Sequence, residues 1–188
     1  MSDLVSSDLQ PRPLPDPAAR GRGGTVYLET YGCQMNVYDS QVILGLLADA
    51  GLVRTDDALL ADVVLVNTCS VREHAEHRVI SRVGELRRRR EQSGRPPAVL
   101  GVCGCMAERL GEALTRQRHP VDLVVGVDRY QELPGLVAGL LDARGEPGPG
   151  GAVPDGAAAS RSAAPAVAVG HDPDVHYVAP PELLPTNN

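Results

Sequence analysis

Short apolar runs alternate with longer amphipathic segments between Thr25 and Leu141. The runs are rich in Val and Leu and show little polar alternation, which is typical of strands buried on both faces of a parallel sheet. We therefore predict four strands, at Thr25–Thr30, Val63–Val66, Ala98–Val102 and Val121–Val125.

The segments between these runs have the spacing of helices. In the first, Ile43, Leu46 and Leu47 recur at intervals of three and four residues and so share one helix face. Asn36 is the predicted N-cap of this helix, and Ser70 with Glu73 forms a capping-box pattern for the second. The predicted helices are about Val37–Ala50, Ser70–Glu91, Ala107–Gln117 and Arg129–Leu141.

Alternating strands and helices predict an α/β fold in which Rossmann-like βα units build a parallel sheet. This domain is expected to span residues 24–142. Residues 1–23 have little periodicity and predict a disordered leader. Residues 143–188 are rich in Gly, Pro and Ala and predict a flexible linker and tail, whose last residues, 171–188, are too few and too Pro-rich to fold alone.

Charge and hydropathy narrow the functional classes. The net charge of −6 argues against a nucleic-acid footprint over the whole chain, although a local basic patch remains open. There is no apolar run of about 18 residues, so no membrane span is expected. The N-terminus has no apolar core of the kind found in signal peptides, which favours the cytoplasm.

The four cysteines lie close to the ends of predicted strands. Cys33 follows the first strand, Cys69 the second, and Cys103 and Cys105 the third. Ligands of parallel α/β sheets bind outside the carboxyl ends of the strands, and neighbouring strands lie about 4.8 Å apart. If the three strands are neighbours, their thiols converge on one edge of the sheet.

Convergent thiolates are ligands for iron–sulfur clusters and for zinc. Three of them suit a four-iron cluster with one iron left open. The wide spacing, without a C-x₂-C knuckle, weighs against a zinc ribbon, but zinc remains open at this point. The alternative is that several of these cysteines are small buried apolar residues, as free cysteines often are.

Three segments carry a family resemblance. GCQMN at 32–36, NTCSVREHAE at 67–76 and GCMAER at 104–109 resemble the signature segments of the N-terminal domain of tRNA methylthiotransferases, and the CQMN form resembles the MiaB type. The resemblance covers about Thr25–Leu140. The three segments occur in the order and spacing of the family.

The resemblance implies a ligand set and an activity. In that family this domain holds an auxiliary [4Fe–4S] cluster, and the matching ligands are Cys33, Cys69 and Cys105, with Cys103 a spare thiol. The full enzymes use S-adenosylmethionine to add a methylthio group at C2 of N6-isopentenyladenosine beside the tRNA anticodon. The open iron is expected to hold the sulfur that is transferred.

The sequence also departs from the family. The full enzymes continue into a radical-SAM domain, whose own cluster is held by a C-x₃-C-x₂-C run, and into a small RNA-binding domain. This sequence has four cysteines and no such run. We expect the radical chemistry to be absent from it, which makes a non-catalytic module that binds zinc or a partner the alternative function.

Other polar residues have two possible explanations each. Arg82, Arg87–Arg90 and Arg95 form the densest basic patch, which either contacts tRNA phosphates or is the solvated end of a helix, the explanation we favour. His74 and His77 are expected at the surface. Asn36 and Asn67 flank cysteines, either as helix or loop hydrogen-bonding groups or as contacts to a cluster.

Overall fold

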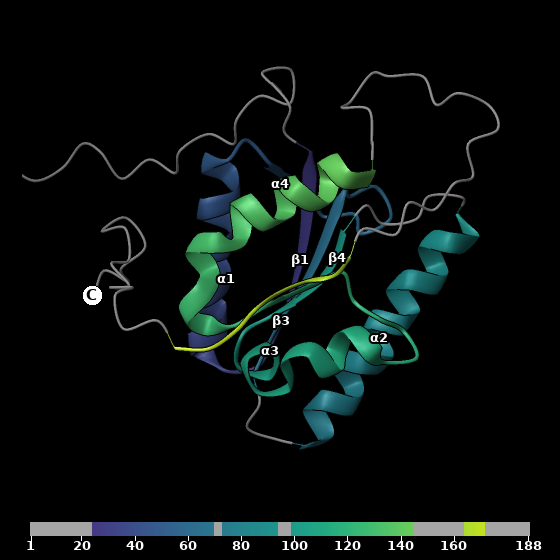
Figure 1. Cartoon of the computed structure of the whole chain (residues 1–188). Coiled ribbons are helices and arrows are strands. Elements are labelled where there is room, and N and C mark those ends of the chain that lie inside the picture. The colour runs from purple at the N-terminus through teal and green to yellow at the C-terminus, as the bar shows by residue number, and fades with distance from the viewer. Residues whose placement is uncertain (1–23, 70–72, 94–98, 145–163, 172–188) are drawn as a thin grey trace, which may run out of the picture.

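The computed structural model describes residues 24–69, 73–93, 99–144 and 164–171. A six-stranded sheet runs through the molecule in the order β2-β1-β3-β4-β5-β6, and every neighbouring pair is parallel (Figure 1). The strands are β1 (Thr25–Tyr31), β2 (Val53–Arg54), β3 (Val63–Thr68), β4 (Val99–Cys103), β5 (Leu123–Val125) and β6 (Ala166–Ala168). The predicted α/β fold with a parallel sheet is confirmed.

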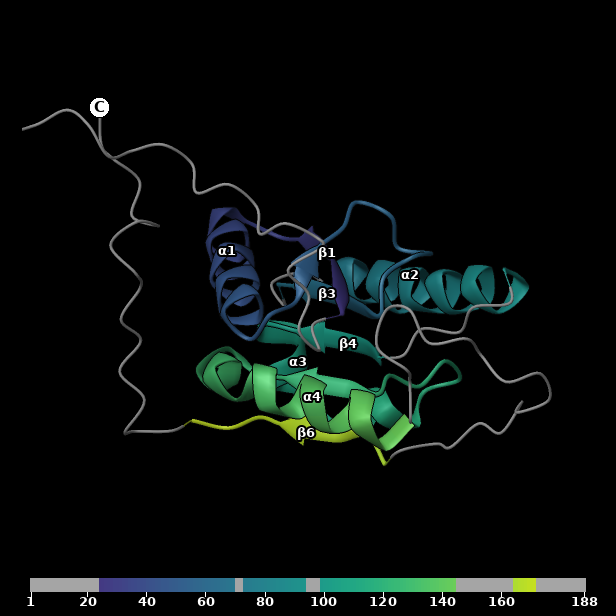
Figure 2. The same cartoon turned by 90° about the horizontal axis from the view of Figure 1, so that it is seen from above.

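Helices cover both faces of the sheet (Figures 1 and 2). One apolar core joins α1 and α4 to the strands, for example through Ile43, Leu47 and Val137, which are fully buried. A second core joins α2 and α3 to the opposite face. The helices are α1 (Gln34–Asp49), α2 (Glu73–Gln92), α3 (Cys105–Leu110) and α4 (Leu133–Arg144), with 3₁₀ segments η2 (Gly111–Arg116) and η3 (Val127–Glu132).

The first helix begins earlier than its apolar pattern predicts. Its N-cap is Cys33, so the prediction that Asn36 is the N-cap is wrong. Asn36 is the third helical residue, and its Oδ1 accepts a hydrogen bond from the Cys33 backbone N–H at 3.2 Å, the back-bonding half of a capping box. This turn requires Gly32, since a Cβ there would lie 2.3 Å from Asn36 Oδ1. The predicted Ser70–Glu73 capping box lies outside the described residues.

Two short strands were not predicted. β2 pairs with the start of β1 in a stretch that reads as a polar connection. β6 pairs with β5 and lies within residues 143–188, so the prediction of a flexible linker is wrong for Ala166–Ala168. The strand forms because successive side chains contact opposite faces of the sheet. Ala166 packs against the first core and Val167 packs against the second. Among the described residues, no helix is both long and apolar enough to cross a membrane.

Candidate functional site

Three cysteine-bearing loops meet at the carboxyl edge of the sheet. β1, β3 and β4 are neighbours, with Tyr31 opposite Thr68 and Asn67 opposite Cys103. Cys33 lies two residues beyond the end of β1, Cys69 directly follows β3, and Cys105 lies two residues beyond the end of β4. The strand adjacency on which the predicted convergence depended is therefore present. We call these three loops, residues 32–33, 68–69 and 104–105, the cysteine edge.

The loops of the cysteine edge are in direct contact. The Cys69 N–H donates to the carbonyl oxygen of Tyr31 at 3.0 Å. A Cβ placed on Gly32 would lie 2.8 Å from the Cβ of Cys69, so the first loop closely approaches the second. A Cβ on Gly104 would lie 2.6 Å from the carbonyl oxygen of Thr68, and Gly104 has φ of 93°. Glycine at 32 and 104 is what allows three loops to pack this closely.

The three thiols have different environments. Cys33 is exposed, whereas Cys69 and Cys105 are half-buried. Hydrogen bonds from the backbone N–H groups of Met35 and Asn36 at the start of α1 hold the pKa of the Cys33 thiol below its usual value. Burial, together with the negative charges of Cys69, Asp39 and Cys33, raises the pKa of Cys105. Gathering these thiolates therefore costs repulsion, which a cationic ligand would relieve.

Cys103 differs from the other three. It is the last residue of β4, has no exposed surface and packs in the core beneath α1 and α4. Burial raises its pKa to about 12, so the thiol stays protonated at neutral pH. A protonated thiol inside an apolar core does not suit a metal ligand, which must be a thiolate with access to the metal.

The donor set of the cysteine edge is chemically suited to an iron–sulfur cluster. Within the described residues, no three His, Cys, Asp or Glu side chains form a group that could hold one metal ion. A four-iron cluster takes one thiolate on each iron, and zinc also takes tetrahedral sulfur ligands, so the three thiols suit either group in kind.

Several polar side chains are buried next to the cysteine edge. Asn36, Asp39 and Ser40 lie on the inner face of α1 and are at most 7% exposed, and Asn67 at the end of β3 has no exposed surface. Burial raises the pKa of Asp39, and the Tyr130 hydroxyl donates to this carboxylate at 3.4 Å. Ser40 and Tyr130 were not among the predicted site residues. A signal existed for Ser40, because positions 36, 39, 40 and 43 share the helix face of the apolar core.

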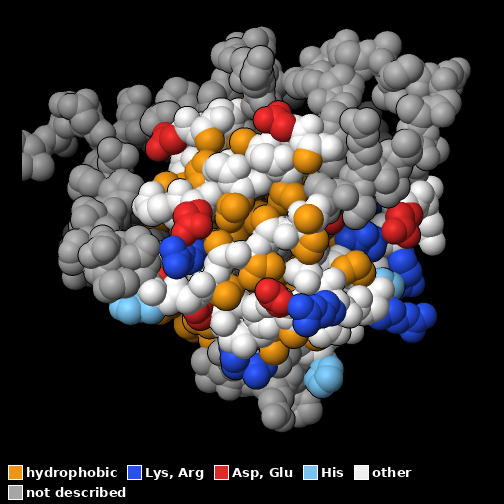
Figure 3. All heavy atoms as spheres, in the orientation of Figure 1, with side chains coloured by type: hydrophobic (Ala, Val, Ile, Leu, Met, Phe, Trp, Pro, Cys, Tyr) orange, Lys and Arg blue, Asp and Glu red, His pale blue; other side chains and the backbone are white. Residues whose placement is uncertain are grey.

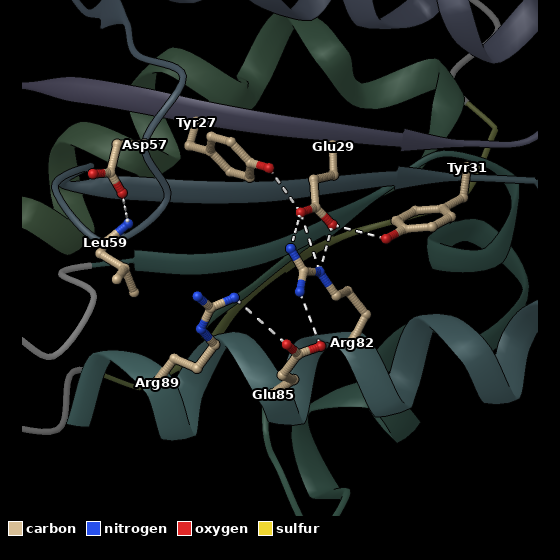
Figure 4. A network of polar contacts seen from close by, with 8 residues as sticks. All are labelled: Tyr27, Glu29, Tyr31, Asp57, Leu59, Arg82, Glu85 and Arg89. Carbon is tan, nitrogen blue, oxygen red and sulfur yellow. Dashed lines mark hydrogen bonds and ion pairs between the residues drawn. The ribbon is translucent and has the colours of Figure 1, made fainter. Parts of the chain in front are cut away.

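The described arginines of the predicted basic patch lie on α2, and basic side chains (blue) gather at the right of Figure 3. Most of these arginines make intramolecular contacts, of which Figure 4 shows those of Arg82 and Arg89. Arg82 Nε donates to both carboxylate oxygens of Glu29, at 2.9 and 3.1 Å, and its guanidinium also pairs with Glu85. Arg90 is 4% exposed and donates to the carbonyl oxygen of Ala58 at 2.7 Å. Arg87 donates to the Pro120 carbonyl oxygen at 2.5 Å. These contacts favour the structural explanation of the patch.

The remaining candidates of the patch give less information. Arg88 and Arg89 are exposed, and Arg89 pairs with Glu85 at 3.6 Å. His77 is exposed, as predicted, whereas the side chain of His74 and the whole of Arg95 lie outside the described residues. The described arginines of the patch lie on α2, whereas the cysteine edge lies at the ends of β1, β3 and β4.

Comparison with known proteins gives one family and a consistent set of relatives. Residues 25–126, more than half of the chain, match the model of Uncharacterized protein family UPF0004. A tRNA-2-methylthio-N(6)-dimethylallyladenosine synthase of Porphyromonas gingivalis is 50% identical over 115 residues, which are 60% of this chain and 24% of that protein. One of the same name from Chloroherpeton thalassium is 47% identical over 112 residues, with the same coverage.

A eukaryotic relative is similarly close. The human mitochondrial tRNA methylthiotransferase CDK5RAP1 is 44% identical over 120 residues, which are 63% of this chain and 20% of that protein. The matched region thus spans about a quarter or less of the length of these relatives. The resemblance carried by the three cysteine segments is confirmed: the chain belongs to Uncharacterized protein family UPF0004, and its curated relatives are tRNA methylthiotransferases.

Proposed function

We propose that residues 24–142 form the auxiliary cluster-binding domain of a tRNA methylthiotransferase, in which Cys33, Cys69 and Cys105 are the protein ligands of a [4Fe–4S] cluster. The observation that carries this proposal is the contact between three cysteine-bearing loops at adjacent strand ends. The names of the relatives supply the reaction class. The buried position of Cys103 supports its exclusion from the ligand set.

The protein contributes ligands and orientation to this chemistry. Cys33 is presented at the start of α1, where backbone N–H groups stabilise its thiolate form. Cys69 and Cys105 are held close to the sheet by the backbone contacts of their loops. A cluster bound by three thiolates offers one iron that no protein group ligates, where the sulfur for transfer can bind.

The substrate and the other half of the reaction are proposed from the resemblance to tRNA methylthiotransferases. The activity proposed is addition of a methylthio group to C2 of N6-isopentenyladenosine beside the tRNA anticodon, so the macromolecular partner is tRNA. S-adenosylmethionine and a second cluster would be held by a radical-SAM domain with a C-x₃-C-x₂-C run, which residues 1–188 do not contain. We propose a monomer in the cytoplasm, where thiols remain reduced.

The test is anaerobic reconstitution of the purified chain with iron and sulfide. The wild-type chain should bind about four irons and four sulfides per molecule, as expected for one [4Fe–4S] cluster. Cys33→Ala, Cys69→Ala and Cys105→Ala should each lose the cluster. Cys103→Ala is the matched control, since it removes a thiol from the same segment as Cys105 but should retain full iron content.

Two results would contradict the proposal. Full iron content in Cys69→Ala would show that the ligand set is wrong. Zinc without inorganic sulfide in the protein as isolated, together with no uptake of iron and sulfide, would instead identify a zinc-binding or partner-binding module.

A further inference from the structure

Asn67 lies next to the cysteine edge, on the middle one of the three strands that lead to it. It is the fifth residue of β3, two residues before Cys69, and its side chain has no exposed surface. In the sheet it lies beside Thr30 on β1 and Cys103 on β4. Its position is therefore between the two strands that lead to the other two cysteine loops.

The amide nitrogen of Asn67 ties the first loop to the second. Its Nδ2 donates to the carbonyl oxygen of Asn36 and to the Oγ of Ser40, both at 2.9 Å. Asn36 in turn accepts from the N–H of Cys33, and Ser40 Oγ lies 2.7 Å from the hydroxyl of Thr30 at the end of β1. One amide group thus fixes the first two turns of α1, and with them Cys33, to the strand that carries Cys69.

The amide oxygen of Asn67 faces the third loop. A Cβ on Gly104 would lie 2.5 Å from this Oδ1, so only glycine allows the loop before Cys105 to pass. The oxygen is buried and has no hydrogen-bond partner among the described residues. A buried polar atom without a partner costs free energy, a cost that an apolar side chain does not incur. A stability role alone therefore does not account for asparagine here.

We propose that Asn67 is a positioning residue that sets the spacing of the three cysteine loops, holding α1 through its amide nitrogen and meeting the Gly104 turn with its amide oxygen. The inference rests on the proposed function, because the loops it spaces are those that carry Cys33, Cys69 and Cys105. Asn67 itself does not ligate iron. Its effect is on how well the three thiolates are arranged before a cluster is bound.

The test compares Asn67→Leu with the wild-type chain. Leucine has the same branching as asparagine, although it is larger, and it removes both donated hydrogen bonds without burying a charge. The thermal melting temperature of the variant should fall by several degrees, because two hydrogen bonds are lost and a larger side chain enters a fully buried site. Its affinity for the reconstituted cluster should fall by about 10- to 100-fold, the range found when outer partners of metal ligands are removed. Affinity is measured anaerobically by competition with an iron chelator. The visible circular dichroism and reduction potential of any remaining cluster should also change.

Two further variants separate positioning from loss of stability. Asn67→Ser keeps a small polar group that is too short to reach α1, and should also weaken cluster binding. Val64 lies on the same strand but on the opposite face of the sheet, in the core beneath α2. Val64→Ala should lower the melting temperature and leave the cluster affinity and reduction potential unchanged.

The outcomes discriminate between the two hypotheses. If the wild-type chain takes up no four-iron cluster, the proposed function fails. If the wild type binds the cluster and both Asn67 variants bind it equally tightly with the same potential, the positioning role is refuted and the proposed function stands. An equal loss of affinity in Val64→Ala would refute the positioning role as well, because destabilisation of β3 would then explain the effect.

Discussion

A half-buried carboxylate joins β1 to α2, and its removal should cost measurable stability (Figure 4). Glu29 accepts hydrogen bonds from the hydroxyls of Tyr27 and Tyr31, at 2.8 and 2.9 Å, and from Arg82. The side chain of Glu29 is 12% exposed and that of Arg82 is 24% exposed, so water screens the pair only in part. We predict that Glu29→Gln, which keeps the shape of the side chain, destabilises the fold.

The magnitude follows from the contacts. Hydrogen bonds to a charged group contribute about 1.5–3 kcal/mol each when protected from water. A glutamine side chain has one acceptor oxygen, so at least one Arg82 donor would face an amide NH₂ group in place of an oxygen. Allowing for partial exposure, we expect a loss of about 2 kcal/mol, or roughly 8 °C in melting temperature for a domain of this size.

The pH dependence of this loss is specific to Glu29. Burial raises its pKa, but the hydrogen bonds from Arg82, Tyr27 and Tyr31 outweigh that effect and hold the pKa below the ordinary 4.5. A carboxyl group whose pKa is lowered by folding stabilises the fold at pH values above its pKa in the unfolded state. This contribution is lost as the pH falls through its pKa in the folded state. The difference between wild type and Glu29→Gln should thus be constant from pH 7 to about 5 and shrink below pH 4.5.

The assay is urea unfolding of both proteins between pH 7 and pH 3. Arg54→Ala is the control, because Arg54 pairs with Asp56 at the surface, where the side chains are 56% and 96% exposed. That change should alter the free energy of unfolding by less than about 0.5 kcal/mol. A Glu29→Gln effect below 0.5 kcal/mol, or one that persists undiminished at pH 3, would refute the reasoning.

Three other predictions concern the cysteine edge and the sixth strand. Gly104→Ala should destabilise the fold by about 2–4 kcal/mol in urea unfolding, because the residue has a positive φ and the new Cβ would lie 2.6 Å from a backbone carbonyl oxygen. Glu108→Ala removes the carboxylate that accepts from the Gly170 N–H at 2.7 Å and so anchors the residues after β6. Opening of β6 should become easier, and the Ala166 amide, which donates to Asp122, should exchange with solvent about 10-fold faster. Asp39→Asn should raise the free energy of unfolding at pH 7, because burial raises the pKa of Asp39 and so makes its charged form unfavourable in the folded state. The charge of Asp39 destabilises the fold increasingly as the pH rises above the pKa of this group in the unfolded state, about 3.8. The gain in the free energy of unfolding of Asp39→Asn should therefore vanish below that pH, which urea unfolding at a series of pH values would measure.

Apolar runs were sufficient to predict the central sheet. Val63–Val66 consists of Val and Leu, and Ala98–Val102 of Ala, Val, Leu and Gly without a polar side chain, and the observed strands begin or end within two residues of them. Such runs are decisive because a strand buried on both faces needs apolar side chains at every position. The sixth strand has no comparable signal, because Ala and Val over three residues also occur in flexible Ala-rich segments.

The cysteine edge was predictable in part for the same reason. The ends of the predicted strands are enough to bring Cys33, Cys69 and Cys105 to one edge of the sheet, provided that the three strands are neighbours. The resemblance made Cys103 a spare thiol, but its burial was not predicted, since the sequence alternation near it does not separate an inward from an outward thiol. The contacts of Asn67 could not be predicted, because they join residues 27 and 31 positions apart and depend on how α1 packs against β3.

The distribution of polarity along α1 argues that its first turns serve the cysteine edge at the expense of stability. Toward the end of the helix the buried face is apolar, with Ile43 and Leu47 fully enclosed. Toward the start, the same face buries Asn36, Asp39 and Ser40, where apolar residues would bury more hydrophobic surface without the cost of desolvating polar groups. If the polar residues only satisfied the helix N-terminus, the second turn would not need them, because the first four N–H groups alone lack helical partners. Asp39 and Ser40 lie beyond that first turn. Their hydrogen bonds tie α1 to η3 through Tyr130 and to β3 through Asn67, so we infer that they fix the position of the helix that presents Cys33.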